Sequence, residues 1–205
     1  MTIRFHQHDL PDLARYDVEA VAIDTETLGL KPRRDRLCVV QLSPGDGTAD
    51  VVQITAGQKR APNLVALLRN QRITKLFHYA RFDLAVLYYT FGTMPQPVFC
   101  TKIASRLTRT YTDRHGLKDI CSELLGIGLS KAQQSSDWAA EKLSPEQLEY
   151  AASDVLYLHR LRDVLVERLK RENRTREAEA CFKFLPTRAK LDLMGWDEED
   201  IFAHS

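Results

Sequence analysis

Ala20-Val21-Ala22-Ile23-Asp24-Thr25-Glu26 is the stretch that decides the predicted fold. Its first four residues are apolar and include two β-branched side chains, which is typical of a buried strand, and its last three residues are polar. Successive side chains of a strand point to opposite faces, so Asp24 and Glu26 point to the same face. The stretch therefore predicts a buried strand that ends in two carboxylates on one side of a sheet.

Further strands are expected downstream of this stretch. Residues 37–42 and 50–54 are apolar segments separated by Ser43-Pro44-Gly45-Asp46-Gly47, a dense turn signal that predicts a hairpin. Residues 75–77 and 98–100 predict two more short strands, with helical patterns between them. This βαβ alternation, followed by a helical C-terminal half, predicts an α/β fold with a mixed five-stranded sheet flanked by helices.

The helical half carries a third acidic position, Asp154. Ser144-Pro145-Glu146 predicts a helix start, with Ser as the N-cap and Pro at the first helical position, and the helix is expected to run to about residue 170. Residues four apart share a helix face, so Tyr150 and Asp154 should converge. Asp83 is expected in the first turn or so of an earlier helix, where the helix dipole tolerates a carboxylate.

The composition restricts the class of protein. A chain of 205 residues suits one domain, residues 1–205, with a core at about 15–170. With 44% hydrophobic and 28% charged residues and no apolar run near the ~20 residues of a membrane span, a soluble protein is expected. Its N-terminus lacks a secretory signal, so the cytoplasm is the expected compartment. The net charge of +1 predicts contact with few phosphates rather than with a long duplex.

Four carboxylates and one tyrosine are the candidate catalytic residues: Asp24, Glu26, Asp83, Asp154 and Tyr150. Taken alone, each motif has a common non-catalytic explanation: a solvated strand end, a helix cap or part of an amphipathic helix. Asp24 and Asp154 have apolar neighbours, however, and carboxylates in such settings need a partner, because close unpaired carboxylates repel by ~4 kcal/mol at an effective dielectric of 20. Two divalent cations ~3.5–4 Å apart would cancel this charge, so the set predicts a two-metal phosphodiesterase.

Three motifs resemble those of the DEDD 3′–5′ exonuclease superfamily. Asp24-Thr25-Glu26-Thr27 is similar to its first motif, residues 78–83 (His-Tyr-Ala-Arg-Phe-Asp) to its second, and residues 150–154 (Tyr-Ala-Ala-Ser-Asp) to its third in the tyrosine form. Ser136-Asp137-Trp138 is similar to the segment before the third motif of ribonuclease D, and the likeness covers most of residues 15–170. Ribonuclease D proper continues into helical RNA-binding domains. This chain therefore resembles most the short single-domain members called nano-RNase C.

The resemblance implies a ribonuclease-H-like fold and a specific activity. The four carboxylates would hold two Mg²⁺ or Mn²⁺ ions, one binding the attacking water and one stabilising the leaving 3′-oxyanion, and the product would be a nucleoside 5′-monophosphate. Tyr150, with a reference pKa of ~10, would keep its proton and orient the water. The expected substrates are very short oligoribonucleotides, including dinucleotides.

Other functions stay open at this point. One is ribonuclease D-like trimming of structured RNA 3′ ends, and another is single-stranded DNA exonuclease activity, because the contact to the 2′-hydroxyl cannot be located in the sequence. A non-catalytic nucleic-acid-binding module is a third, although retention of the four carboxylates and the tyrosine speaks against it.

Three residues are candidate substrate contacts: Leu30, His78 and Lys131. Leu30 corresponds in position to a leucine that oligoribonuclease-type members insert between the two bases of a dinucleotide, and the alternative is a loop leucine folded onto the core. His78 and Lys131 could reach phosphate oxygens, although a structural role fits a lone histidine or lysine better. His6 and His8, near the chain end, are expected to be solvated.

Residues 171–205 are predicted to form a C-terminal helix and tail. From Pro186 onward the tail mixes acidic residues with these apolar ones: Leu191, Leu193, Met194, Trp196, Ile201 and Phe202. Chain ends fray unless they are docked, so the tail is expected to pack on its own domain or on a neighbouring subunit. Nano-RNase C enzymes form closed multi-subunit rings, so the resemblance implies a homo-oligomer.

Overall fold

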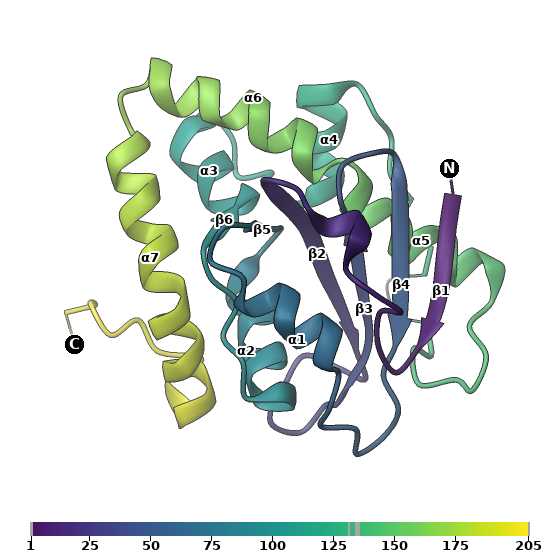
Figure 1. The fold of residues 1–205 in the computed structure, drawn as a ribbon. Helices are drawn as coiled ribbons and strands as arrows, with labels where there is room; N and C mark the ends of the chain where they lie inside the picture. Colours follow the sequence, from purple (N-terminus) through teal and green to yellow (C-terminus); the bar gives the residue numbers. More distant parts are fainter. Residues whose placement is uncertain (1, 131, 134–135, 205) are drawn as a thin grey trace.

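Within the residues that the computed structural model describes, 2–130, 132–133 and 136–204, six strands form one mixed sheet with helices on both faces (Figure 1). The strands are β1 (Thr2–Gln7), β2 (Ala20–Thr27), β3 (Leu37–Ser43), β4 (Thr48–Gln53), β5 (Thr74–Phe77) and β6 (Val98–Cys100). The helices are α1 (Pro62–Arg69), α2 (Ala80–Phe91), α3 (Thr101–Thr108), α4 (Leu117–Leu125), α5 (Pro145–Leu156), α6 (Leu158–Arg171) and α7 (Thr175–Leu191), with a 3₁₀ turn at Ala14–Tyr16 and a π-helical turn at Asp192–Trp196. None of these helices is long and apolar enough to cross a membrane.

The strand order is β1-β4-β3-β2-β5-β6. β2 pairs antiparallel with β3 and parallel with β5, and β5 pairs parallel with β6. The apolar start of β2 is buried as predicted, and burial of a side chain such as Ile23, which is 0% exposed, stabilises the fold by about 1.5–3 kcal/mol. The predicted hairpin is confirmed as β3 and β4, and its turn contains Gly45 and Gly47 at φ of 93° and 81°, where a Cβ would be strained.

The sheet has one strand more than the five predicted. The added strand is β1, which pairs parallel with β4 along one edge of the sheet, from Thr2 beside Thr48 to Gln7 beside Gln53. Its sequence alternates polar residues with Ile3 and Phe5, but none of its described side chains is fully buried and Phe5 is 41% exposed. The expectation that His6 is solvated is wrong, because its Nε2 lies 2.8 Å from Asp50 Oδ1.

The long helix predicted from residue 145 to about residue 170 is two helices. The structure interrupts the helical path at Tyr157, between α5 and α6. The predicted start is confirmed, because Ser144 Oγ accepts from Gln147 N at 3.2 Å and Gln147 Oε1 accepts from Ser144 N at 2.8 Å, which is a capping box. The break lets α5 pack on β2, β3 and β4 while α6 packs mainly on α3 and α4 (Figure 1).

The C-terminal tail lies against its own domain. α7 packs beside α2 and β6 (Figure 1). Arg81, in the first turn of α2, donates from Nε and Nη2 to the Asp192 carboxylate at 2.6 and 2.8 Å. Lys31 Nζ lies 2.9 Å from Glu198 Oε1. Ionic contacts therefore join the tail to the loop after β2 and to the start of α2.

Candidate active site

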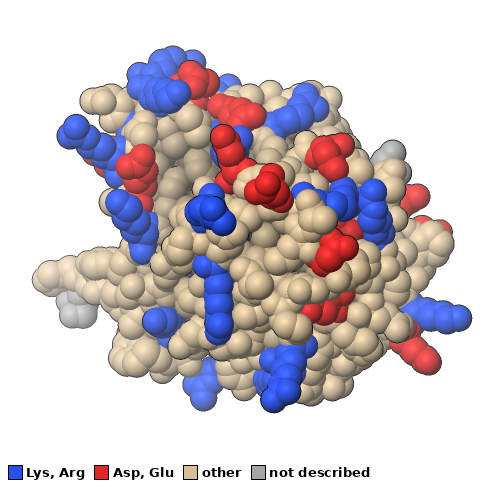
Figure 2. Space-filling view, in the orientation of Figure 1, with Lys and Arg blue, Asp and Glu red and all other residues tan. Residues whose placement is uncertain are grey.

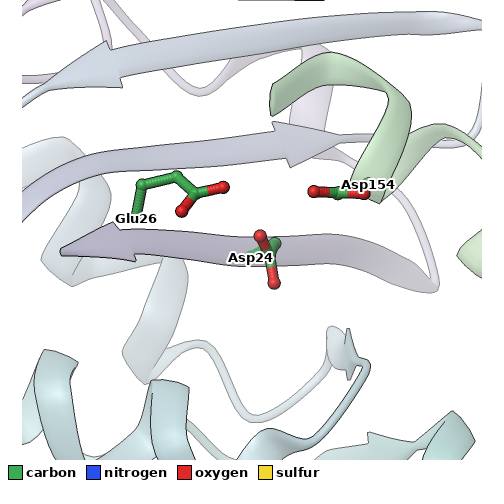
Figure 3. Close-up of side chains that lie close together, drawn as sticks. All are labelled: Asp24, Glu26 and Asp154. Carbon is green, nitrogen blue, oxygen red and sulfur yellow. The ribbon is translucent and has the colours of Figure 1, made fainter. Parts of the chain in front are cut away.

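Three of the predicted carboxylates converge where the end of β2 meets α5 (Figure 3). Asp24 and Glu26 come from one face of β2, because side chains two apart on a strand point the same way, and Asp154 comes from α5. One oxygen of each of the three lies within 4.8 Å of the other two. Figure 3 shows the three side chains extending toward a common space from the strand and the helix.

Asp83 approaches the same strand from α2. Its side chain is buried, and its Oδ1 accepts a hydrogen bond from Thr25 Oγ1 at 2.7 Å. Thr25 lies between Asp24 and Glu26 in the chain, so this bond anchors Asp83 to the strand that carries them. Asp83 is outside the three-residue cluster, but its charge raises the pKa of both Asp24 and Glu26.

The pKa values of all four carboxyl groups are raised, chiefly because burial removes the water that stabilises the charged form. Burial and repulsion from Asp154 and Asp83 raise the pKa of Glu26 to about 9. Among the described residues, no Lys, Arg or His forms an ion pair with any of the four. Oxygen ligands with uncompensated negative charge suit hard divalent cations, so the donor set fits Mg²⁺ or Mn²⁺.

Tyr150 reaches the cluster from the same helix face as Asp154. It lies one turn before Asp154, and its hydroxyl donates a hydrogen bond to the Asp154 carboxylate. Burial, and then the charge of Asp154, raise the pKa of Tyr150 above its ordinary value. Its ring packs 6.0 Å from the Trp138 ring, centroid to centroid. Tyr150 is therefore a protonated, positioned hydrogen-bond donor at neutral pH.

Gln41 is a site residue that the sequence prediction missed. It lies on β3 directly opposite Asp24, and its Nε2 donates to Asp24 Oδ2 at 2.9 Å. A hydrogen bond from Gln41 also lowers the pKa of Glu26. The side chain is 0% exposed, and its Oε1 has no hydrogen-bond partner among the described residues. The sequence does contain a signal for Gln41, because it is an amide in the middle of an otherwise apolar strand. A buried polar group needs a hydrogen-bond partner, and this one could have pointed to the carboxylates.

The predicted substrate contacts have different surroundings. Leu30 is 83% exposed in the loop after β2, so the alternative in which it folds onto the core is wrong. The Nδ1 of His78, which is half-buried, lies 3.0 Å from Thr101 Oγ1. Burial, and then the charge of Lys102, lower the pKa of His78 to about 3, so its imidazole is neutral at pH 7. Lys131 lies outside the described residues.

Known proteins share both the sequence and the fold of this chain. A family model described as a 3′–5′ exonuclease matches residues 7–170. Ribonuclease D of Gluconacetobacter diazotrophicus is 38% identical over 154 residues, which make up 75% of this chain and 39% of that protein. This chain therefore spans well under half the length of that curated relative.

Solved structures match the chain over its whole length, and two of them hold a bound ligand. NrnC of Brucella melitensis with bound Mg²⁺ is 76% identical, covers 100% of both chains and gives a TM-score of 0.97. NrnC of the same organism bound to pGG is also 76% identical, with the same coverage and a TM-score of 0.98.

Proposed function

Because this chain belongs to the 3′–5′ exonuclease family, we propose that it is a metal-dependent 3′–5′ exoribonuclease that releases nucleoside 5′-monophosphates from very short RNAs, dinucleotides included. The observation that carries the proposal is the convergence of Asp24, Glu26 and Asp154 with no cationic side chain paired to them in the described part of the chain. The pGG bound to B. melitensis NrnC supports the short substrate. On the face that Figure 2 shows, Lys and Arg are interspersed with Asp and Glu.

The four carboxylates are the proposed metal ligands, with Asp24, Glu26 and Asp154 as the tight cluster and Asp83 beside it. The Mg²⁺ in B. melitensis NrnC supports magnesium as the metal. When bound, a pair of divalent cations would supply activation of the attacking water and stabilisation of the leaving 3′-oxygen.

The chain's own residues orient the reacting groups. Tyr150 stays protonated and is placed to donate a hydrogen bond near the Asp154 carboxylate, which suits an orienting role rather than that of a base. Gln41 and Thr25 hold two of the carboxylates by hydrogen bonds of 2.9 and 2.7 Å. Leu30 is exposed close behind Glu26 in the chain and is the proposed contact to a substrate base.

The test uses 5′-labelled RNAs of two and of seven nucleotides, incubated with the protein in Mg²⁺ or in EDTA. We expect the dinucleotide to be hydrolysed faster, and EDTA to stop both reactions. Comparable rates on the two lengths would contradict the preference for short substrates. Faster hydrolysis of the longer RNA would favour ribonuclease D-like trimming, the activity suggested by the name of the curated relative. The same assay with DNA of two and of seven nucleotides shows whether the protein hydrolyses RNA faster than DNA.

A further inference from the structure

Trp138 fills the space between the sheet and the start of α5. Its side chain is 2% exposed, and it packs in a small apolar cluster with Cys38 and Val39 of β3, Val51 of β4 and Ala151 of α5. This cluster is separate from the large core on which the other helices pack. The indole therefore lies under the helix that brings the third acidic motif to the site.

The side-chain amides of two glutamines fix the segment around this indole. Gln147 Nε2 donates to Ser136 Oγ and to the Asp137 carbonyl, both at 3.0 Å. Gln53 Nε2, at the end of β4, donates to the Ala140 carbonyl at 2.8 Å. Gln147 is also the capping-box residue of α5, so the start of α5 and the segment before it are held by one side chain.

The indole contacts the ring of Tyr150. The two ring centroids are 6.0 Å apart and the planes are inclined by 42°, within the range of favourable aromatic pairs. Tyr150 is half-buried and packs on the same apolar cluster as Trp138. Its hydroxyl, at the far end of the ring, donates to the Asp154 carboxylate. Because the indole limits how the Tyr150 ring can turn, it also limits where the hydroxyl lies.

The indole is held by its shape. Its Nε1 is buried and has no hydrogen-bond partner among the described residues. An N–H left unpaired in the interior costs about 1–3 kcal/mol, a cost that a leucine or phenylalanine at this position would not carry. The contribution of Trp138 therefore lies in the surface that it presents to its neighbours, the Tyr150 ring among them.

We propose that Trp138 is a positioning residue for hydrolysis, whose indole holds the Tyr150 ring so that the hydroxyl reaches the attacking water. The inference rests on the proposed function. It assigns Trp138 an effect on the rate of the chemical step through Tyr150, and no part in metal binding.

The first test is the kinetics of Trp138→Leu on a labelled dinucleotide in Mg²⁺. Loss of one donor in an active site costs about 10²–10³-fold in kcat, and a misplaced donor costs less, so we expect kcat to fall about tenfold. KM and the Mg²⁺ affinity in calorimetry should stay within about twofold of wild type, because their contacts are unchanged. Trp138→Phe keeps an aromatic ring against Tyr150 and should recover most of the rate.

A double-mutant cycle with Tyr150→Phe tests whether Trp138 acts through the hydroxyl. Once the hydroxyl is absent there is nothing left to position, so adding Trp138→Leu to Tyr150→Phe should change kcat by no more than about twofold. If Trp138→Leu lowers kcat as much in the Tyr150→Phe protein as in the wild type, the two residues act independently and the proposal is wrong.

Phe182→Leu is the matched control for a general loosening of the fold. Phe182 is a buried aromatic residue of α7 whose ring packs 4.7 Å from that of Phe99, centroid to centroid. This variant should lower the midpoint of thermal unfolding and keep the wild-type kcat. A fall in kcat equal to that of Trp138→Leu would assign both effects to loosening and overturn the proposal. A fall in the Mg²⁺ affinity of Trp138→Leu would also overturn it, because the indole would then support α5 as a whole.

Crystal structures of the wild type and of Trp138→Leu test the positioning without any activity. We expect the Tyr150 hydroxyl to move by about 1 Å or more in the variant, a displacement large enough to slow a reaction. An unmoved hydroxyl would overturn the role of Trp138. If the wild type hydrolyses no RNA, the proposed function is wrong, and the two structures still decide whether Trp138 places Tyr150. Trp138→Phe replaces Trp138→Leu in each comparison if the leucine variant does not fold.

Discussion

Asp24 lies close to the other three carboxylates of the site. Burial, and then repulsion from Asp83, Asp154 and Glu26, raise its pKa. Asp24→Asn removes this repulsion, and the amide oxygen of the new side chain can still accept the hydrogen bond from Gln41 Nε2. In EDTA we therefore expect the unfolding midpoint to rise by about 2–4 °C, the shift that roughly 1 kcal/mol causes in a chain of this size. Hydrolysis should be lost, and added Mg²⁺ should stabilise the wild type more than the variant. Full activity of the variant would contradict the site.

Gln41 is predicted to position Asp24 for metal binding. Replacing it by Met keeps the bulk of the side chain and removes the hydrogen bond to Asp24 Oδ2. Loss of such a supporting bond typically weakens metal binding about 10- to 100-fold, and we expect Mg²⁺ affinity in calorimetry to fall within that range. Gln53→Met is the matched control, because Gln53 is also buried in the sheet but donates to the Ala140 carbonyl. Equal Mg²⁺ affinities in the two variants would remove this role from Gln41.

Tyr150→Phe tests whether Tyr150 orients the attacking water or instead supports metal binding. The variant keeps the ring that packs on Trp138 and loses the hydroxyl that bonds Asp154. We expect kcat to fall about 100-fold, the scale of one lost donor in an active site, while Mg²⁺ affinity stays within about twofold of wild type. Single-turnover rates and calorimetry measure the two quantities. If the metal affinity falls together with kcat, Tyr150 acts mainly by holding Asp154 in place.

Among the helices, α3 and α4 are joined by a charge pair away from the carboxylates. The side chain of Arg109, at the end of α3, is 0% exposed, and its Nε donates to Glu123 Oε1 at 3.0 Å. Glu123→Gln leaves the guanidinium without its anion. We expect a loss of about 1–2 kcal/mol in urea unfolding, kept small because the Glu123 side chain is 40% exposed to screening water.

The same pair predicts the direction of a pH dependence. Hydrogen bonds from Arg109, and then from Tyr111, lower the pKa of Glu123 from 4.5 to about 2. Because the folded pKa is below the unfolded one, the stabilisation is complete above pH 4.5 and is lost as the pH falls toward 2. Unfolding measured across this range should show less acid sensitivity in Glu123→Gln than in the wild type. Glu179→Gln, at an exposed position of α7, should behave like the wild type.

The elements that carry the motifs could be predicted because each has a strong local signal. β2 has a continuous apolar run before Asp24, and α5 has Ser144 and Gln147 as a capping box. The alternation of strand side chains was enough to place Asp24 and Glu26 on one face.

Other features depend on contacts that no local pattern encodes. β1 is an edge strand whose partner, β4, lies more than 40 residues away in the chain, and the break at Tyr157 depends on how α5 and α6 pack on the sheet. The hydrogen bond from Gln41 to Asp24 requires the register of β2 with β3. The contact between the Trp138 and Tyr150 rings forms only when residues 136–140 dock on β4 and α5.

At the scale of the whole molecule, the tail leaves apolar surface uncovered. These side chains are exposed: Met194, Trp196, Ile201 and Phe202. We expect a second copy of the chain to cover part of this surface, and we predict that Phe202→Asp lowers the mass measured by light scattering. Leu30→Asp introduces the same charge at another exposed apolar residue and should leave the mass unchanged. An unchanged mass for Phe202→Asp would exclude the tail from subunit assembly.

The tail also contacts two segments that lie next to the candidate site residues in the chain. Lys31 follows Leu30 directly and is held by Glu198, a residue 167 positions later, while Arg81, two residues before Asp83, is held by Asp192. During translation the strands and the carboxylates of the central sheet leave the ribosome before these anchoring acids do. A nascent chain can thus assemble its proposed metal ligands before the loop that bears Leu30 contacts Glu198, and that contact can form only after residues 192–198 have emerged.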